Sequence, residues 1–254
     1  MIEYVKKTAK EAGKELMKYY EIPSSSYKKA LDDRKATATE AERMSKKIIS
    51  DAIHKKFPNH EVYGKGETKK SQDSDYLWYI DPLDGSTNFS RKIPLFGLSI
   101  GLIYKGFPIL GVLYFPKLKL IIYGEKGKGA YVNNHKKVKV SSRSLEESLY
   151  YISTAETRGG WSFPSLKDQV GWIRAIDASS YEFAQIAMGD ADLYTSKNAY
   201  FCDIVAGAII VEEAGGKVTD EKGGKWSVSS NVMITSNGAE HEKIISLIQK
   251  DLKQ

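Results

Sequence analysis

Two aspartates, a glycine and two hydroxyl residues follow the end of an apolar segment. Leu77 to Ile80 has the pattern of a buried strand, Asp81 comes directly after it, and Pro82 ends ladder pairing. Asp84 follows three positions later, so both carboxylates can face one pocket. Two carboxylates about 4 Å apart at an effective dielectric near 20 repel by roughly 4 kcal/mol, so the pair needs a bound proton or a cation. Carboxylate oxygens are hard ligands, and the segment therefore predicts a Mg²⁺ site, with Mn²⁺ as an alternative.

The residues after Asp84 could bind phosphate beside that cation. Gly85 allows a tight turn, and the backbone amides and hydroxyls of Ser86 and Thr87 can point at an anion. An ordinary turn is the alternative, because aspartate, proline and glycine are all common turn formers. This segment alone leaves both interpretations open.

Length and composition are those of a globular protein. The chain has 254 residues, of which 41% are hydrophobic and 28% charged, and we expect one compact unit over residues 1–254, in which two lobes could meet near residues 141–150. The single Cys202 cannot form an intrachain disulfide, and the first residues lack the apolar core of a signal peptide. No apolar run approaches membrane-spanning length. We therefore expect a cytoplasmic protein without a membrane partner.

The positive charge of the chain suits an anionic partner. The formal net charge is +6 and the pI is near 9, but the lysines are scattered along the sequence and form no single block. No helix-turn-helix, zinc finger or paired aromatic RNA motif is present. We expect a phosphorylated small molecule and no specific nucleic acid, while a non-catalytic anion-binding or nucleic-acid-binding protein is the alternative from another class.

Helical and strand patterns occupy different parts of the chain. Apolar spacing predicts a helix over residues 2–20 and a second helix from Thr37 or Thr39 to Phe57. Thr37 with Glu40, or Thr39 with Glu42, could form a capping box at its start. Strand patterns cover 98–104, 109–115, 120–123, 130–132 and 138–140, for which an antiparallel meander is the simplest arrangement. The glycine-rich segment 124–129 leads into a strand and lacks Walker spacing, so it is predicted to be a hairpin loop.

Two further helices are expected in the last third of the chain. Ser179 with Glu182 predicts a capping box that opens a helix to Met188, and a short strand follows near residues 192–194. Another helix is expected from Asp203 to the stop at residues 215–216. Asp203 could bind metal, but aspartate is also a good N-cap, and position alone does not decide between these roles.

Several of these strings resemble the inositol monophosphatase family. The resemblance rests on Asp81-Pro-Leu-Asp84-Gly-Ser-Thr-Asn-Phe89, on residues 203–207 and 212–216, and on weaker similarities at 37–40 and 127–133. It implies an α/β fold, a layered α-β-α-β-α sandwich of the sugar phosphatase type. It also implies Mg²⁺-dependent, lithium-sensitive hydrolysis of a phosphate monoester, with two or three ions, and a homodimer.

The resemblance assigns roles to individual positions. The metal ligands that it implies are Asp81 and Asp84, the carbonyl of Leu83, Asp203 and a glutamate upstream. The substrate-binding set that it implies is Asp84, Gly85, Ser86, Thr87, Ser179, Ser196, Lys197 and Asp203. The family's sugar-binding glutamate falls on Ser196, whose hydroxyl could bind a polyol, and the neighbouring Lys197 could bind a second phosphate.

The upstream glutamate cannot be aligned uniquely. The family has a glutamate directly after a glycine here, whereas this chain has Gly64-Lys65-Gly66-Glu67. Counting forward from Pro58 puts Lys65 at the ligand position, and a shift of two residues puts Glu67 there. We expect Glu67 to bind metal and to orient water, because an ammonium beside Mg²⁺ would be strongly repelled.

Two more positions depart from the family pattern. Ser86 replaces a threonine and Glu40 replaces an aspartate in the pair that activates water, so the implied catalytic residues are Glu67, Ser86 and Glu40. Cys202 replaces a tryptophan before Asp203, and we expect a buried small side chain there.

The function expected from these observations is hydrolysis of the phosphate monoester of a small polyol or sugar. Inositol 1-phosphate is the first candidate substrate. Fructose 1,6-bisphosphate is the second, because Lys197 could bind another phosphate. Adenosine 3',5'-bisphosphate is the third, with Tyr200 and Trp172 as candidates for stacking on adenine.

Overall fold

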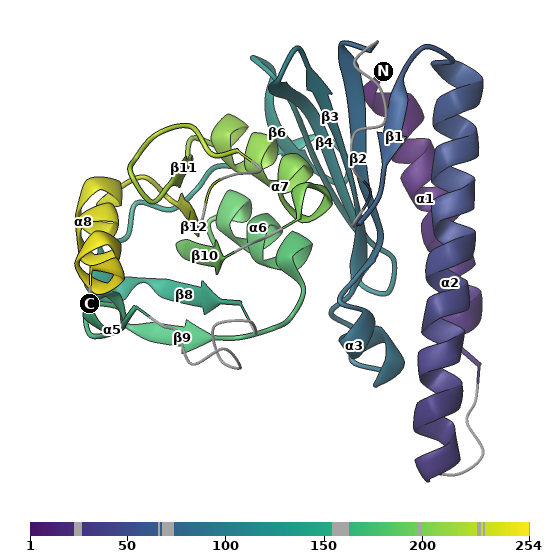
Figure 1. Cartoon of the computed structure of the whole chain (residues 1–254), viewed down its shortest axis with the longest axis horizontal. Helices are drawn as coiled ribbons and strands as arrows, with labels where there is room; N and C mark the ends of the chain where they lie inside the picture. The colour runs from purple at the N-terminus through teal and green to yellow at the C-terminus, as the bar shows by residue number, and fades with distance from the viewer. Residues whose placement is uncertain are drawn as a thin grey trace.

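Two antiparallel helices begin the chain and cover one face of the first sheet. The computed structural model describes residues 1–22, 27–65, 67, 74–153, 163–197, 200–227, 230 and 232–253. Helix α1, Ile2–Tyr20, buries the apolar stripe that its spacing predicts, namely Val5, Ala9, Ala12 and Leu16. It packs against strand β4, and helix α2, Tyr27–Lys56, packs against strand β2 (Figure 1).

Helix α2 begins at Tyr27, ten residues before Thr37, which was the earlier of the two predicted starts. The hydroxyls of Thr37 and Thr39 donate to the carbonyls of Asp33 and Lys35, four residues back, as they do inside a helix. The predicted capping boxes are therefore wrong. Lysine, alanine, leucine and arginine before Thr37 are good helix formers, and they carry the helix through the expected start.

The first sheet has seven strands in chain order. They are β1 (Glu61–Tyr63), β2 (Tyr76–Asp84), β3 (Gly97–Tyr104), β4 (Phe107–Phe115), β5 (Leu120–Glu125), β6 (Gly129–Val132) and β7 (Lys136–Lys137). All neighbours are antiparallel except β1 and β2, which confirms the predicted meander. The strand predicted at 138–140 is wrong, because the Val140 N–H donates to the Ala214 carbonyl at 3.1 Å and the chain leaves the sheet there.

The glycine-rich segment after β5 is the hairpin that the sequence predicts. It connects β5 to β6, and the N–H groups of Gly127 and Gly129 each donate to the Glu213 carboxylate at 2.7 Å. The anion that this loop holds is therefore the protein's own side chain.

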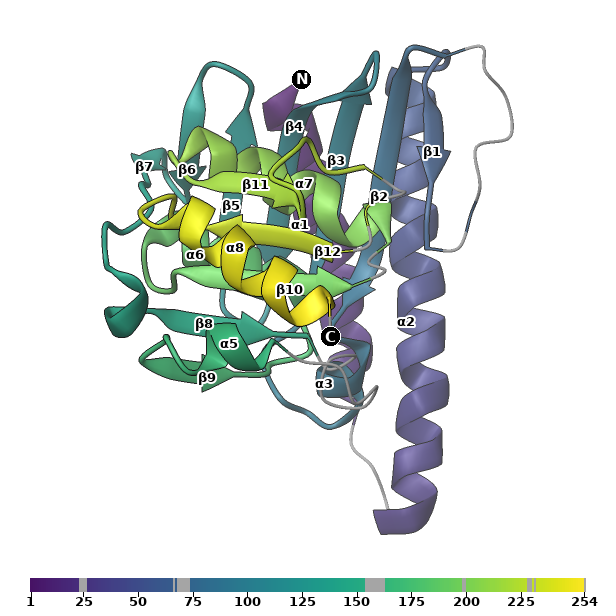
Figure 2. The ribbon, with the colours of Figure 1, turned by 60° about the vertical axis from the view of Figure 1, so that its left-hand side comes forward.

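The second sheet has five strands in the order β11-β12-β10-β8-β9. They are β8 (Leu149–Ile152), β9 (Trp172–Arg174), β10 (Leu193–Lys197), β11 (Lys217–Asp220) and β12 (Val232–Ser236). The 3₁₀ turn η1, Leu145–Glu147, precedes β8. Helices α5, Pro164–Lys167, and α8, His241–Leu252, pack on each other and on the outer face of this sheet (Figure 2).

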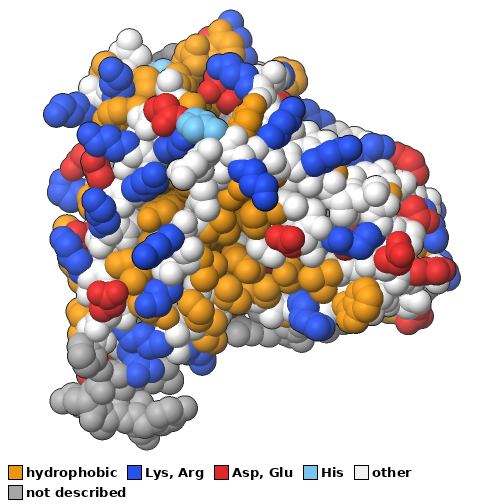
Figure 3. Space-filling view, turned by 180° about the vertical axis from the view of Figure 1, so that it is seen from behind, with side chains coloured by type: hydrophobic (Ala, Val, Ile, Leu, Met, Phe, Trp, Pro, Cys, Tyr) orange, Lys and Arg blue, Asp and Glu red, His pale blue; other side chains and the backbone are white. Residues whose placement is uncertain are grey.

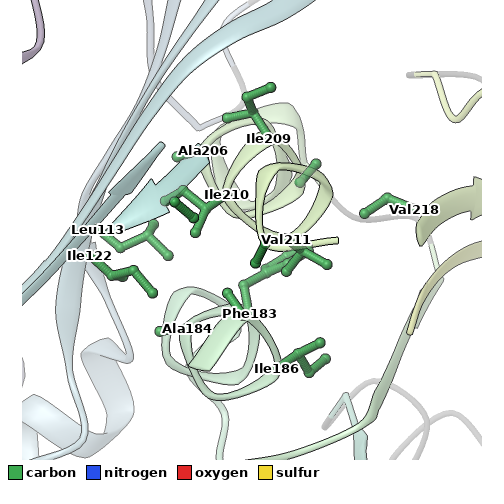
Figure 4. Packing of buried hydrophobic residues seen from close by; sticks show 14 of the residues in the cluster. Leu113, Ile122, Phe183, Ala184, Ile186, Ala206, Ile209, Ile210, Val211 and Val218 are labelled. Atoms are coloured by element: carbon green, nitrogen blue, oxygen red, sulfur yellow. The ribbon is translucent and has the colours of Figure 1, made fainter. Parts of the chain in front are cut away.

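Helices α6, Ser179–Met188, and α7, Phe201–Glu213, fill the space between the two sheets. Their apolar side chains form one cluster with residues of both sheets (Figure 4). The short helix α3, Ser86–Ser90, follows β2. The layers therefore run helix, sheet, helix, sheet, helix, which confirms the predicted α-β-α-β-α sandwich.

Glycines in the first sheet let α7 lie directly on the strands. A Cβ atom on Gly111 would lie 2.3 Å from the carbonyl oxygen of Ala206, and one on Gly101 would lie 2.5 Å from Val205. Real Cβ atoms do not approach backbone oxygen so closely, so only glycine permits this separation of helix and sheet. This contact fixes the position of α7 relative to β3 and β4.

We expect Gly111→Ala to destabilise the fold by about 1–3 kcal/mol, because it forces α7 away from the sheet. Gly124→Ala is the matched control, since its Cβ would face the same helix but lie 3.3 Å from the nearest atom, the Cα of Ile210. Urea unfolding of both variants measures the difference. Equal midpoints for the two variants would contradict the close approach described here.

Candidate active site

A β-bulge brings the two aspartates of β2 to the same face. Asp81 pairs with Ser99 and Asp84 pairs with Gly97, so three residue steps on β2 match two on β3. Residues 97 and 99 share a face of β3, and Asp81 and Asp84 therefore share a face as well. Pro82, which cannot donate to the ladder, lies inside the bulge.

Asp81 and Asp84 are buried carboxylates that accept hydrogen bonds from the backbone. Asp81 is 5% exposed, and its Oδ1 accepts from the Leu83 N–H at 3.0 Å. Asp84 is 9% exposed, and its Oδ2 accepts from the N–H of Ser180 at 2.8 Å and from the Ser180 hydroxyl. Ser180, near the start of α6, is thus the residue that orients Asp84.

The pKa values of both carboxyls are raised in the folded protein. Burial raises the pKa of Asp81 well above its usual range, and the charges of Asp84 and Asp203 raise it further. Burial also raises the pKa of Asp84, and the charge of Asp203 adds to that shift. Desolvation and like charge both disfavour the ionised forms, and a bound cation would remove that penalty.

Asp203 reaches the same place from helix α7. It lies in the first turn of the helix, and Tyr200 occupies the N-cap position, so the alternative N-cap role for Asp203 is wrong. Cys202 beside it is a buried small side chain, as expected, and burial raises the pKa of its thiol. Segments more than 100 residues apart thus place three carboxylates within electrostatic reach of one another.

Lys65 lies within electrostatic reach of these aspartates, whereas the Glu67 carboxylate is held by a lysine of α2. The charges of Asp203, Asp81 and Asp84 all act on the Lys65 ammonium. Glu67 instead accepts from Lys46 of α2 at 2.7 Å and from the Gly64 N–H at 2.6 Å. These contacts hold the Glu67 carboxylate toward α2, and its role at the metal position stays a prediction.

The predicted pair of Ser86 and Glu40 is not brought together either. Both carboxylate oxygens of Glu40 bind Arg43 one turn further along α2, at 2.7 and 2.8 Å. Ser86 and Thr87 lie in α3 and line a separate surface groove with Thr39. Gly85, which precedes them with φ +73°, must be glycine, because a Cβ there would lie 2.8 Å from the Leu95 carbonyl oxygen.

A polar cavity opens beside Asp84 and Asp203. Its volume is about 230 Å³. Its wall includes all four substrate-binding residues predicted from the later part of the chain, which are Ser179, Ser196, Lys197 and Asp203, together with Asp84 and Lys65. Ser179 is the first residue of α6 and Ala178 its N-cap, so the predicted capping box of Ser179 with Glu182 is wrong. Its position as first residue leaves Ser179 at the cavity wall.

Tyr200 also lines this cavity and is half exposed. The sequence gave it, with Trp172, as a candidate for stacking on adenine but could not place it. Its position three residues before the expected helix start at Asp203 was the available signal, because a residue just before a helix start lies near the helix N-terminus.

The donor set fits a divalent cation in charge and ligand type. The three carboxylates supply hard oxygen ligands, which Mg²⁺ and Mn²⁺ prefer. Among the described residues, no three acidic, histidine or cysteine side chains converge on one point as they stand. Asp81 and Asp84 each accept hydrogen bonds within the protein through one carboxylate oxygen.

A family model described as the inositol monophosphatase family matches residues 1–253. The chain belongs to this family. It is 31% identical to the chloroplastic phosphatase IMPL1 of Arabidopsis thaliana, over 98% of this chain and 70% of that protein. It is also 31% identical to a fructose-1,6-bisphosphatase/inositol-1-monophosphatase of Thermotoga maritima, over 87% of this chain and 85% of that protein.

Solved structures agree with this inositol monophosphatase fold. An inositol monophosphatase from Anabaena superposes with a TM-score of 0.84, with 29% identity, over 98% of this chain and 94% of that one. The protein is accordingly a phosphoric monoester hydrolase of a family that generally depends on Mg²⁺. No helix in the described part of the chain combines the length and the apolar composition needed to cross a bilayer.

We expect Asp81→Asn to stabilise the metal-free protein at pH 8. The folded state raises the pKa of Asp81, so above that pKa the ionised carboxyl lowers the free energy of unfolding, and asparagine removes this loss. For a chain of this length each kcal/mol gained raises the thermal midpoint by about 2–4 °C. Thermal unfolding with a chelator present measures the shift.

Asp192→Asn is the matched control with the opposite sign. The Asp192 side chain is 1% exposed, and it pairs with Arg143 at 2.9 Å. Removing one partner of this pair should lower the midpoint. A lower midpoint in both variants would show that Asp81 is not repelled by its neighbours.

Proposed function

We propose that this protein hydrolyses the phosphate monoester of a small polyol or sugar, with inositol 1-phosphate as the first substrate to test. The observation that carries the proposal is the meeting of Asp81, Asp84 and Asp203 beside a polar cavity. Family membership supports the reaction class, and the serines of the cavity suit a ligand rich in hydroxyls.

Asp81, Asp84, Asp203 and the Leu83 carbonyl would hold the divalent ion. Bound there, Mg²⁺ would polarise a phosphate oxygen and lower the pKa of a water. Two or three such ions are implied for the family pattern, and Mn²⁺ would be accepted at the same ligands.

The chain's own residues would bind and orient the ester. The N-terminus of α7 and the ammonium groups of Lys65 and Lys197 would attract the phosphate. Ser179 and Ser196 would bind hydroxyls of the polyol, and Gly85, Ser86 and Thr87 would offer N–H groups from the start of α3. These contacts hold the ester bond beside Asp84.

Proton transfer from water is proposed for Glu67 and for Ser86 with Glu40. Both glutamates now bind cationic side chains, Lys46 and Arg43, at partly exposed positions. Exposed ion pairs contribute little to stability, so either carboxylate can leave its partner at low cost.

A bisphosphate ester is the second candidate substrate. Lys197 and Lys65 both line the cavity, and two ammonium groups could neutralise two phosphates. Relatives from Thermotoga maritima and Aquifex aeolicus, 31% and 33% identical, carry the name fructose-1,6-bisphosphatase/inositol-1-monophosphatase. Fructose 1,6-bisphosphate is therefore the ester to compare with inositol 1-phosphate.

Adenosine 3',5'-bisphosphate is the third candidate. Tyr200 is half exposed at the cavity and could stack on adenine. Trp172, the other aromatic residue considered for this role, lies on β9 and is not in the cavity wall.

The quaternary and cellular properties remain proposals as well. We propose a homodimer, lithium sensitivity and a cytoplasmic location. Sedimentation, inhibition by Li⁺ and cell fractionation would test these three properties. On the face shown in Figure 3, lysine and arginine side chains are interspersed with acidic and apolar ones, which gives no support to a nucleic-acid-binding role.

We expect Asp84→Asn to lower Mg²⁺-dependent phosphate release by roughly 100-fold or more, because it removes a charged ligand and leaves the Ser180 hydrogen bond. Circular dichroism should show an unchanged fold. Asp51→Asn, at an exposed position of α2, is the control and should keep full activity. Near-normal turnover in Asp84→Asn would contradict the proposed site.

A substrate panel tests the choice of ester. We expect Lys197→Ala to raise the KM for fructose 1,6-bisphosphate several-fold and to change the KM for inositol 1-phosphate little, because only the bisphosphate would use this ammonium. Phosphate release from both esters and from adenosine 3',5'-bisphosphate, each with Mg²⁺, gives the comparison. Equal effects on all three esters would show that Lys197 does not distinguish them.

A further inference from the structure

We propose that a groove between helix α1 and the first sheet binds a compact anion with linked phosphate groups. The groove is lined by residues of α1, of β4 and the turn after it, of β5 and of the segment after β6. The active-site cavity lies on the other face of this sheet, among α6, α7 and β10, and shares no lining residue with the groove. A ligand bound in the groove is therefore additional to the substrate of the proposed reaction.

Cations and hydrogen-bond donors make up much of the groove wall. Its volume is about 620 Å³, and Lys10 and Lys14 of α1 line it together with Lys119 of the turn between β4 and β5. Asn133 adds a neutral donor. Its Oδ1 atom accepts from the Ile121 N–H at 3.0 Å, so its NH₂ group is the part left to donate to a ligand. The described residues of the wall include no aspartate or glutamate.

Among the described residues, the three lysines of the groove have no carboxylate within ion-pair distance, although other lysines of α1 do. Each of the three glutamates of α1 pairs with a lysine of the same helix other than Lys10 and Lys14, at 2.8, 3.9 and 2.6 Å. The carboxylates of the helix are thus already used. Like charges that line one groove repel one another, and a bound anion would remove that repulsion.

A glycine inside α1 gives the groove a wall of fixed shape. Glycine is unfavourable within a helix, yet Gly13 lies in the middle of α1 and is buried. A Cβ atom there would lie 2.4 Å from the Tyr114 ring, so any side chain at this position would push the ring out of its place in the wall. Burial raises the pKa of Tyr114, so its hydroxyl stays protonated at neutral pH and can donate.

Linked phosphates suit this wall in charge, in hydrogen bonding and in size. A phosphate group carries about two negative charges at neutral pH and has oxygens that accept strong hydrogen bonds. The three ammonium groups exceed the charge of one phosphate, so we infer a ligand with at least two. The volume of the groove lies within the range of roughly 300–1,000 Å³ that small-molecule sites have.

The test is the binding of inorganic tripolyphosphate to the intact chain, measured by isothermal titration calorimetry. Metal-free protein is used, because the aspartates of the active site then repel an anion. We expect Lys10→Ala and Lys14→Ala each to weaken the Kd by about three- to tenfold, since each removes one charged donor from the wall. Lys119→Asn should have the same effect, and asparagine is chosen because residue 119 has φ +52°.

Two variants serve as controls for this loss of affinity. Lys250→Ala removes an exposed lysine from helix α8, at the opposite end of the layered fold, and changes the net charge by the same amount. Lys197→Ala removes an ammonium from the active-site cavity. Both should leave the Kd for tripolyphosphate unchanged. All three groove lysines are exposed, so circular dichroism should show the wild-type fold in every variant.

Four outcomes would overturn the proposal. They are no binding of tripolyphosphate at millimolar concentration, an equal loss of affinity in Lys250→Ala, a loss confined to Lys197→Ala, and tighter binding of a short single-stranded RNA that depends on Lys10 and Lys14. The last result would make the groove a nucleic-acid surface. Because the groove and the active-site cavity share no residue, none of these outcomes depends on whether the proposed ester is hydrolysed.

Discussion

Repulsion among three carboxylates is the constraint that the rest of this structure must overcome. Asp81 and Asp84 are both buried. The charge of Asp203 raises the pKa of both, and the charge of Asp84 also raises the pKa of Asp81. Nothing in a stability argument favours such a cluster, because burial and like charge both penalise the ionised forms. The penalty is explained if the site exists to hold a cation, since a bound cation would relieve the repulsion.

The fold meets this constraint with a few local devices. A bulge at Pro82 turns two aspartates of one strand to a common face, and the Ser180 N–H fixes the orientation of Asp84 from helix α6. Helix α7 contributes Asp203 because glycines in β3 and β4 let its backbone lie against the sheet. Each device is rigid secondary structure, so the carboxylates keep their positions against their mutual repulsion.

Periodic patterns predicted most of the fold. The apolar stripe of α1 and the strands of the meander follow spacing rules that need no knowledge of the partner. The predicted start of α2 was wrong because the residues before Thr37 are good helix formers, so the helix already includes the threonine that was expected to cap it. The strand predicted at 138–140 was wrong because the Val140 N–H donates a hydrogen bond to the carbonyl of Ala214, which is close in space and distant in sequence.

The site was predictable only in part, because motifs do not show which contacts each side chain makes in the folded chain. Motifs identified Asp81, Asp84 and Asp203, and the structure places them within electrostatic reach of one another. The choice of Glu67 over Lys65 assumed a metal ion at that position, whereas in this structure Glu67 is held by Lys46 and the charges of the aspartates act on Lys65. Likewise Glu40 is bound by Arg43 one turn away, a local pairing that competes with any longer-range role.

The most direct measurement is anomalous diffraction from a crystal of this protein soaked with Mn²⁺. The account predicts a strong peak within bonding distance of the Asp84 and Asp203 carboxylates and close to Asp81, with the Lys65 ammonium nearby. A well-ordered site with no peak near any of these aspartates would contradict the claim that they form a cation site.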